Sequence, residues 1–372
     1  MSAMSRFAVI LLLVSVPTAV WTRSQASLQQ PPEFVSVNQT KVGGGVQIKG
    51  LVAGKRFVLR MPTRWNGSLV IGAHGGGGGN NFDRAGNVIG TDETALDDVI
   101  GRHALAHGFA YASVDRDGAG NGEVGLQLTA QFTRLAKLEV EHRGGRTATH
   151  VYLVGLSAGG GIARLAVEAS DELYSGAVII AGAGGDLVTR LDRQVRMAAL
   201  WPLIDPRANF GIAPSDPKML AYAEAIGTPV AARRLWPYTG AGAVAAAARP
   251  SSATETVTAR IQVPTIEVVG TWDDLVIREV RAYSERVQPR AKHRLYQVNG
   301  VWHMSGDDDG VMSFQYIATA RMKLDPDVAN AMGEGPSYLP AVRDAFDDLV
   351  RWVERGTAAP PSQTVQPGSK LR

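Results

Sequence analysis

The stretch VYLVGLSAGGG at residues 151–161 places one serine among glycines, between an apolar run and a segment with helical spacing. Residues 155–159 within it fit the pattern Gly-x-Ser-x-Gly. A strand before this pattern and a helix after it form the sharp turn on which a nucleophilic serine is typically exposed. Small neighbours are needed there because a bulky side chain would clash with the strand or the helix. The pattern therefore predicts that Ser157 is a catalytic nucleophile.

Short apolar runs alternate with helical segments around this stretch. Strands are predicted at residues 68–75, 109–115, 149–155, 175–183, 261–270 and 293–300. Helices are predicted at residues 94–108, 124–141, 160–170, 275–287 and 341–356. The alternation indicates an α/β fold with a mostly parallel sheet flanked by helices on both faces. Ahead of it, residues 46–53 and 56–62 predict an antiparallel hairpin.

The expected organisation is a single domain over residues 27–372. An irregular region at about 186–262, rich in Ala, Arg, Trp and Pro, follows the predicted strand 175–183, which is the sixth when the two hairpin strands are counted. An insertion at this place is expected to form a lid over a cleft. The tail at about 357–372 is rich in proline and is predicted to be loose.

The first 26 residues have the pattern of a secretory signal peptide. Arg6 precedes an apolar run at residues 7–16, and Ser24-Gln25-Ala26 forms a small-x-small cleavage site. The alternative is a membrane anchor, but the run is shorter than the roughly 20 residues that a membrane span needs. We therefore expect a secreted or periplasmic protein without stable membrane insertion after cleavage. The chain has no cysteine, so its stability must come from its core and not from disulfides.

The charge balance does not indicate a nucleic-acid partner. The formal net charge is +3, from 38 Lys and Arg against 35 Asp and Glu. Without residues 1–26, which contain Arg6 and Arg23, it falls to 36 − 35 = +1. No basic stripe stands out elsewhere in the sequence.

A nucleophilic serine requires a base and an acid, which follow it in this type of fold in the order Ser, acid, His. Only His293 and His303 follow Ser157. His303 comes after the predicted strand 293–300, at the end where open α/β sheets place their sites, and is therefore the predicted base. His293 begins that strand, at the end away from the site.

The acid is predicted to follow an earlier strand, again at its carboxyl end. Asp273 in TIEVVGTWDDLV is the first candidate, and Asp274 is expected to cap the helix that begins at Leu275. Asp274 itself and Asp186, after IIAGAGG, remain alternatives for the acid.

The donors for a developing oxyanion are predicted in the loop His74-Gly75-Gly76-Gly77-Gly78-Gly79 and directly after the nucleophile. The backbone amides of Gly75, Gly76 and Ala158 are the candidates, because glycine lets an amide approach without a side chain in the way. His74 is expected to brace this loop and not to bind a metal.

These residues resemble the serine hydrolases of the α/β-hydrolase fold. The resemblance covers about residues 45–355 and rests on four motifs in the right order, HGGGG, GLSAGG, GTWDDLV and GVWH. It implies the α/β-hydrolase fold and a Ser157–His303–Asp273 triad.

The ending DDLVRWVERGTAAPP and the Gly-x-Ser-x-Gly-Gly elbow also look like the tannase and feruloyl-esterase group, secreted esterases of aromatic acids. That group carries a disulfide between cysteines next to the nucleophile and the histidine, where this chain has Leu156 and Met304. The group's large calcium-binding lid also looks too big for this chain. The resemblance therefore extends to the reaction type and not to the substrate.

The expected function is hydrolysis of carboxylic esters through an acyl-enzyme, without a cofactor or metal. Alternatives are cleavage of a C–C bond in a diketone, or of an amide or lactam, by the same triad, and a non-catalytic binding protein on this fold. Asp307, Asp308 and Asp309 are interpreted as an acidic, solvated loop and not as a calcium site. An apolar, aromatic or polymeric substrate is indicated by four tryptophans: Trp201, Trp236, Trp272 and Trp302. The alternative is that the tryptophans in the insertion only pack the lid.

Overall fold

A computed structural model describes most of the chain outside its N-terminus and two long internal segments. The described residues are 33–42, 44–75, 80–82, 88–91, 97–116, 123–169, 172–184, 257–271, 273, 276–301 and 337–372. All of them belong to one unit that spans residues 33–372. The predicted signal peptide, residues 1–26, lies outside them.

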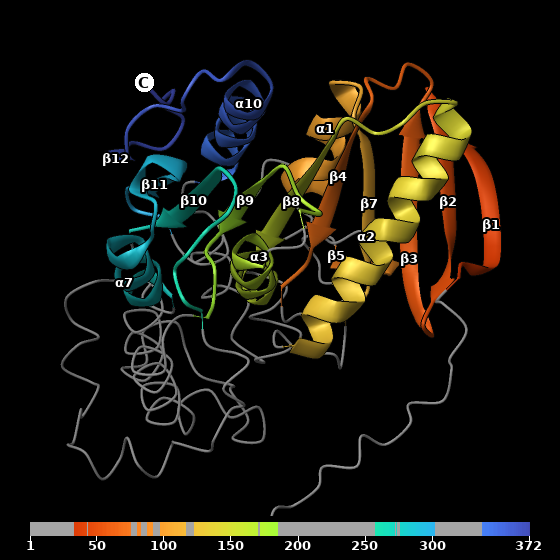
Figure 1. Ribbon diagram of the computed structural model, residues 1–372, viewed down its shortest axis with the longest axis horizontal. Coiled ribbons are helices and arrows are strands. Elements are labelled where there is room, and N and C mark those ends of the chain that lie inside the picture. The colour runs from red at the N-terminus through yellow and green to blue at the C-terminus, as the bar shows by residue number, and fades with distance from the viewer. Residues whose placement is uncertain are drawn as a thin grey trace, which may run out of the picture. The chain divides into compact units, whose positions relative to one another are not determined.

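A ten-stranded sheet organises this unit, with the strand order β1-β2-β3-β7-β4-β8-β9-β10-β11-β12 (Figure 1). Its first three strands are antiparallel: β1 (Val35–Val42), β2 (Gly45–Val52) and β3 (Lys55–Pro62). From β7 onward neighbouring strands run parallel: β7 (Ala110–Val114), β4 (Ser68–Ala73), β8 (His150–Leu156), β9 (Gly176–Ile180), β10 (Thr265–Gly270), β11 (His293–Val298) and β12 (Gln363–Val365). The predicted hairpin and mostly parallel sheet are confirmed.

Helices cover both faces of the sheet. On one face lie the π-helix η1 (Asp97–Gly101), α1 (Arg102–Ala106) and α10 (Leu339–Arg355). On the other lie α2 (Glu123–Gly144) and α3 (Ala158–Glu168), and α7 (Ile277–Arg286) packs near β10 and β11. A short 3-10 turn, η5 (Arg290–Lys292), leads into β11.

The side chains of β8 show why its sequence is apolar throughout. Tyr152, Val154 and Leu156 belong to the core beneath α10, whereas Val151 and Leu153 belong to the core beneath α2 and α3. Successive side chains of a strand point to opposite faces, so a strand covered on both faces has no polar side to show.

Besides β12 in the C-terminal tail, three strands were not predicted. β1 reads VSVNQTKV and all its side chains are exposed, so it lacks the burial pattern that marks a strand. β5 (Asn80–Phe82) and β6 (Val88–Thr91) form a separate antiparallel pair between β4 and η1.

The C-terminal tail corrects the prediction of a loose segment after Thr357. Residues 363–365 form β12, which pairs in parallel with β11. Before β12, the carbonyl oxygens of Ala359 and Pro360 accept hydrogen bonds from Arg294 and Tyr296 at 3.0 and 2.8 Å. Hydrogen bonds to the side chains and backbone of β11 therefore order this proline-rich segment, which has little intrinsic preference for a regular structure.

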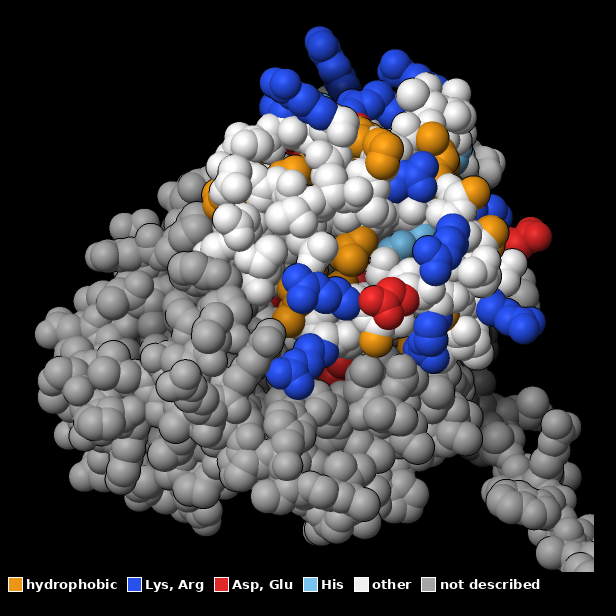
Figure 2. Space-filling view, turned by 90° about the vertical axis from the view of Figure 1, so that its left-hand side faces the viewer, with side chains coloured by type: hydrophobic (Ala, Val, Ile, Leu, Met, Phe, Trp, Pro, Cys, Tyr) orange, Lys and Arg blue, Asp and Glu red, His pale blue; other side chains and the backbone are white. Residues whose placement is uncertain are grey.

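β12 ends one side of the sheet, and Figure 2 looks at this side of the molecule. Lys and Arg side chains are spread over the described surface in this view. Charged side chains near a sheet edge hinder the pairing of its edge strand with another chain.

The predicted lid insertion, residues 186–262, lies outside the described residues up to position 256. Its last residues belong instead to the core. Val257, Ala259 and Ile261 are buried, and the Ala259 amide donates a hydrogen bond to Glu168 on α3 at 2.8 Å.

Candidate active site

Ser157 lies in the turn between the end of β8 at Leu156 and the start of α3 at Ala158. Its backbone has φ 54° and ψ −115°, a conformation that L-residues other than glycine adopt rarely. Two hydrogen bonds hold the turn against the end of β9. The Ser157 amide donates to Ile180 O at 2.9 Å, and the Ala183 amide donates to Ser157 O at 2.9 Å. The structure therefore has the strained strand–helix turn that the sequence predicted for a nucleophile.

The two glycines of Gly-x-Ser-x-Gly are required by close backbone packing. A Cβ at Gly155 would overlap the carbonyl of Gly159 one turn ahead. A Cβ at Gly159 would overlap the carbonyl of Ala73 and lie 2.6 Å from the carbonyl oxygen of His74. The first turn of α3 thus packs directly on the end of β4, which brings the loop after β4 next to Ser157.

Gly75 and Ala158, two of the predicted oxyanion donors, both border the serine. A Cβ at Gly75 would lie 3.3 Å from the Ser157 Cβ and 3.9 Å from its Oγ. Ala158 is the first residue of α3, where amides have no acceptor within the helix and the helix dipole is positive. Gly76, the third predicted donor, lies outside the described residues.

His74 braces the loop after β4, as predicted. The residue is buried, and its Nε2 accepts a hydrogen bond from the Arg116 amide at 2.8 Å. The imidazole is therefore neutral, with the proton on Nδ1, which donates to Gly75 O at 2.7 Å. The His74 ring thus connects Gly75, through Nδ1, to the backbone after β7, through Nε2.

Arg116 and Asp115 follow β7 and complete this brace. The Arg116 guanidinium donates to the carbonyl of His74, and Asp115 forms an ion pair with Arg56 on β3 at 2.9 Å. Burial lowers the pKa of Arg116 to about 10, although the charge of Asp115 partly offsets this. The Arg116 side chain therefore remains charged at neutral pH and ties β7 to the loop that carries Gly75.

Asp273, the predicted acid, is fully buried just beyond the carboxyl end of β10. Its Oδ1 accepts a hydrogen bond from the Val276 amide at 3.3 Å, and its backbone carbonyl accepts one from the Ile277 amide at 2.8 Å. The helix begins at Ile277 and not at Leu275, so the Asp273 carboxylate supports the start of α7. Asp274, which was expected to cap this helix, lies outside the described residues.

The loops after β10 and β11 are joined near Asp273. The Thr271 amide donates to Val298 O at 2.9 Å, and the Gly300 amide donates to the Thr271 hydroxyl at 3.0 Å. A Cβ at Gly270 would overlap the carbonyl of Val301. The chain after β11 therefore lies against the start of the loop that carries Asp273, shortly before position 303 in the sequence. His293 is buried at the opposite end of β11, as predicted.

Several predicted site residues lie outside the described residues, so the structure does not place them. These are His303, Gly76, Trp201, Trp236, Trp272, Trp302 and the alternative acid Asp186. Met304 and the acidic segment Asp307, Asp308 and Asp309 also lie outside the described residues.

Sequence reasoning missed a buried charge network behind α3. Arg164 on α3 and Glu267 on β10 are 0 % and 1 % exposed and form two hydrogen bonds, of 2.7 and 3.2 Å. The Arg164 guanidinium also lies over the ring of Tyr283 at 4.5 Å and donates to the carbonyl of Gly184. The Gly184 amide in turn donates to Glu279 on α7 at 2.7 Å.

This network links the helix that begins at the nucleophile to the strand and helix on either side of Asp273. The available signal was one Arg in the apolar segment 160–170 and one Glu in TIEVVG. Charged residues are almost never fully buried unless they are paired, so each of them pointed to a partner elsewhere.

Solved structures support the fold assignment. An esterase from Aspergillus oryzae aligns with a TM-score of 0.56 at 14% identity, over 88% of this chain and 88% of that chain. Feruloyl esterase B from Aspergillus oryzae aligns with a TM-score of 0.51 at 12% identity, again over 88% of each chain. At such identities the similarity shows the fold alone. A search of curated proteins finds no match.

None of the helices in the described residues is both long and apolar enough to cross a membrane.

A family model described as an alpha/beta hydrolase domain matches residues 111–370. This match spans the elbow at Ser157, the buried Asp273 and the tail strand β12. With its ten-stranded, mostly parallel sheet and its strand–serine–helix turn, the chain belongs to the alpha/beta hydrolase domain family.

Proposed function

We propose that this protein hydrolyses carboxylic esters, with Ser157 as the nucleophile. The observation that carries the proposal is the backbone of Ser157, which has a positive φ of 54° at the junction of β8 and α3, with Gly75 packed against its side chain. A strained non-glycine residue at the carboxyl edge of a parallel sheet points to function.

In the proposed reaction the Ser157 Oγ attacks the ester carbonyl carbon while its proton passes to His303. The carbonyl oxygen becomes an oxyanion, which the amides of Gly75, Gly76 and Ala158 stabilise. His303 returns the proton to the departing alcohol, and an acyl-serine remains. Water then attacks the acyl-serine with His303 as base, which releases the acid and restores Ser157.

Asp273 is proposed to orient His303 and to stabilise the imidazolium. Its carboxylate is buried, and α7 and the Thr271–Gly300 contact hold its loop. The interlocked loops after β10 and β11 support the pairing, because they bring the chain that leads to His303 past the Asp273 loop.

The proposed substrate is an ester with an apolar, aromatic or polymeric acyl or alcohol group, bound against Trp201, Trp236, Trp272 and Trp302. One of the solved neighbours is a feruloyl esterase, so feruloyl esters belong among the substrates to be tested. The proposal also includes export, with cleavage after Ala26. N-terminal sequencing of the mature protein would test the cleavage site.

Labelling with a fluorophosphonate probe tests the nucleophile. We expect one equivalent of probe on the peptide that contains Ser157, and none on Ser157→Ala. Ser369→Ala, at an exposed serine in the tail, should label like the wild type. No labelling of the wild type, or full labelling of Ser157→Ala, would overturn the proposal.

A substrate panel tests the reaction class. It should contain nitrophenyl esters of increasing chain length, feruloyl esters and matched amides, and Ser157→Ala should be inactive on all of them. Faster turnover of an amide than of its matched ester would favour the amide alternative over the proposed esterase.

A further inference from the structure

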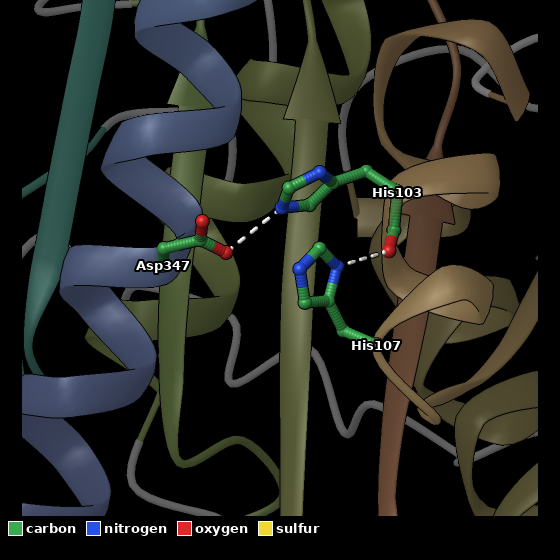
Figure 3. A group of neighbouring side chains, drawn as sticks. All are labelled: His103, His107 and Asp347. Atoms are coloured by element: carbon green, nitrogen blue, oxygen red, sulfur yellow. Dashed lines mark hydrogen bonds and ion pairs between the residues drawn. The ribbon is translucent and has the colours of Figure 1, made fainter. Parts of the chain in front are cut away.

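Two histidines and one aspartate come together on the face of the sheet that α10 covers. His103 lies on α1, His107 follows directly after α1, and Asp347 lies on α10 (Figure 3). Each offers one ligand atom, and these atoms lie within 4.8 Å of one another. His107 lies shortly before β7 begins at Ala110, so the cluster is near the amino ends of the parallel strands. Ser157 is at their carboxyl ends, and the cluster is therefore separate from the candidate active site.

The orientation of His107 suits a metal ligand. Its Nδ1 lies 2.8 Å from the backbone carbonyl oxygen of His103, which can only accept, so Nδ1 carries the proton. The lone pair is then on Nε2, which faces the cluster in Figure 3. Histidines that bind metals usually donate their second ring nitrogen to a carbonyl or carboxylate in this way.

His103 is held from two sides. Its Nε2 lies 2.8 Å from Asp347 Oδ1, and its ring makes an edge contact with Phe346, with centroids 6.2 Å apart. Phe346 is fully buried in the core beneath α10. The His103 and His107 rings lie 4.3 Å apart. Contacts within the fold thus bring all three groups together before any ligand arrives.

The charges on α10 leave Asp347 facing the histidines. Lys370 pairs with Asp344 at 2.6 Å and Arg351 pairs with Asp348, whereas the ion pair of Asp347 is with His103. The Asp347 side chain is 36% exposed and that of His103 is 16% exposed, so water can reach the cluster.

We propose that His103, His107 and Asp347 form a binding site for a divalent transition-metal ion, best matched by Zn²⁺, with water as the remaining ligand. Two imidazoles and one carboxylate are a ligand set that Zn²⁺ accepts, at bonds of about 2.0–2.2 Å. The ion would replace the proton between His103 and Asp347. It would bridge α1 and α10, which are far apart in the sequence, and its effect would be structural.

The test uses the full-length, tag-free protein, stripped with EDTA and titrated with ZnCl₂ by calorimetry. We expect one site with a Kd in the micromolar range or tighter. His107→Gln and Asp347→Asn should each weaken it at least about tenfold, because removing even a supporting partner of a metal ligand costs about that much. His142→Gln, at an exposed histidine on α2 outside the cluster, should bind like the wild type.

Hydrogen exchange gives a second measurement that does not depend on activity. Zn²⁺ should slow amide exchange in residues 102–107 and in α10 of the wild type, and not in His107→Gln. Absence of binding below about 100 μM Zn²⁺, or binding that His107→Gln and Asp347→Asn leave unchanged, would overturn the proposal. Either result would identify the cluster as a simple His–Asp pair.

Discussion

The buried network behind α3 makes Arg164→Met the most informative stability variant. Methionine keeps the apolar length of the arginine stem but removes its charge. Arg164 is 0% exposed and faces two carboxylates that are also buried, Glu267 at 1 % and Glu279 at 0 %. Removing one partner of a buried ion pair lowers the free energy of unfolding by about 3–5 kcal/mol. We expect a decrease in the upper part of this range, because two buried carboxylates lose the charge of Arg164.

The loss should also depend on pH. Burial by itself would raise the pKa of Glu267, but Arg164 and, next to it, His293 outweigh burial through their charges and hydrogen bonds and hold the pKa below its usual 4.5. In the wild type, Glu267 therefore stabilises the fold above pH 4.5, and this contribution is lost as the pH falls below that value. In Arg164→Met the charge and hydrogen bonds of Arg164 are lost, and burial is opposed by His293, whose Nε2 lies 3.7 Å from Glu267 Oε1. The pKa of Glu267 therefore rises relative to the wild type. The deficit should then be larger at pH 8 than at pH 5.5.

Urea unfolding at both pH values measures the effect. Arg143→Met is the matched control, since Arg143 pairs with Glu139 on the surface of α2 and such pairs contribute about 0–1 kcal/mol. Glu267→Gln should cost less than Arg164→Met, because Arg164 keeps Glu279 as a partner. The reasoning is refuted if Arg164→Met costs no more than Arg143→Met, or if its deficit does not shrink at pH 5.5.

Three further variants test the site and the fold. Asp273→Asn should lower kcat by up to about 10⁴ with little loss of stability, because the asparagine oxygen can still accept the Val276 amide. If Asp274→Asn is instead the damaging change in esterase assays, the assignment of the acid is wrong. Gly159→Ala should abolish turnover and cost about 1–3 kcal/mol in urea unfolding, because its methyl group would overlap the Ala73 carbonyl. Wild-type turnover in that variant would contradict the packing argument. Deleting residues 357–372 removes β12 and uncovers β11, so a lower thermal midpoint and aggregation on heating are expected. An unchanged midpoint would show that the tail is dispensable.

The parallel strands and the elbow could be predicted because their signals are local. A strand buried on both faces must be apolar at every position, as in β8, and a strained turn that packs against two carbonyls must have glycine on both sides. Asp273 could be placed because it follows such a strand at its carboxyl end.

Other features depend on contacts between distant segments and could not be predicted. β12 has three residues in a proline-rich tail, and only its pairing with β11 makes it a strand. Arg164 and Glu267 are 103 positions apart, so each shows in the sequence as an isolated charge without an indicated partner. His103 and Asp347 are likewise 244 positions apart.

The backbone of Ser157 sets activity against stability in this protein. A residue held at φ 54° costs about 1–3 kcal/mol, and glycine would relieve that cost by losing the side chain altogether. A search for more robust variants that scores only resistance to heat or denaturant will therefore favour glycine at position 157 and select against the nucleophile. Directed evolution of this protein must score turnover and stability together.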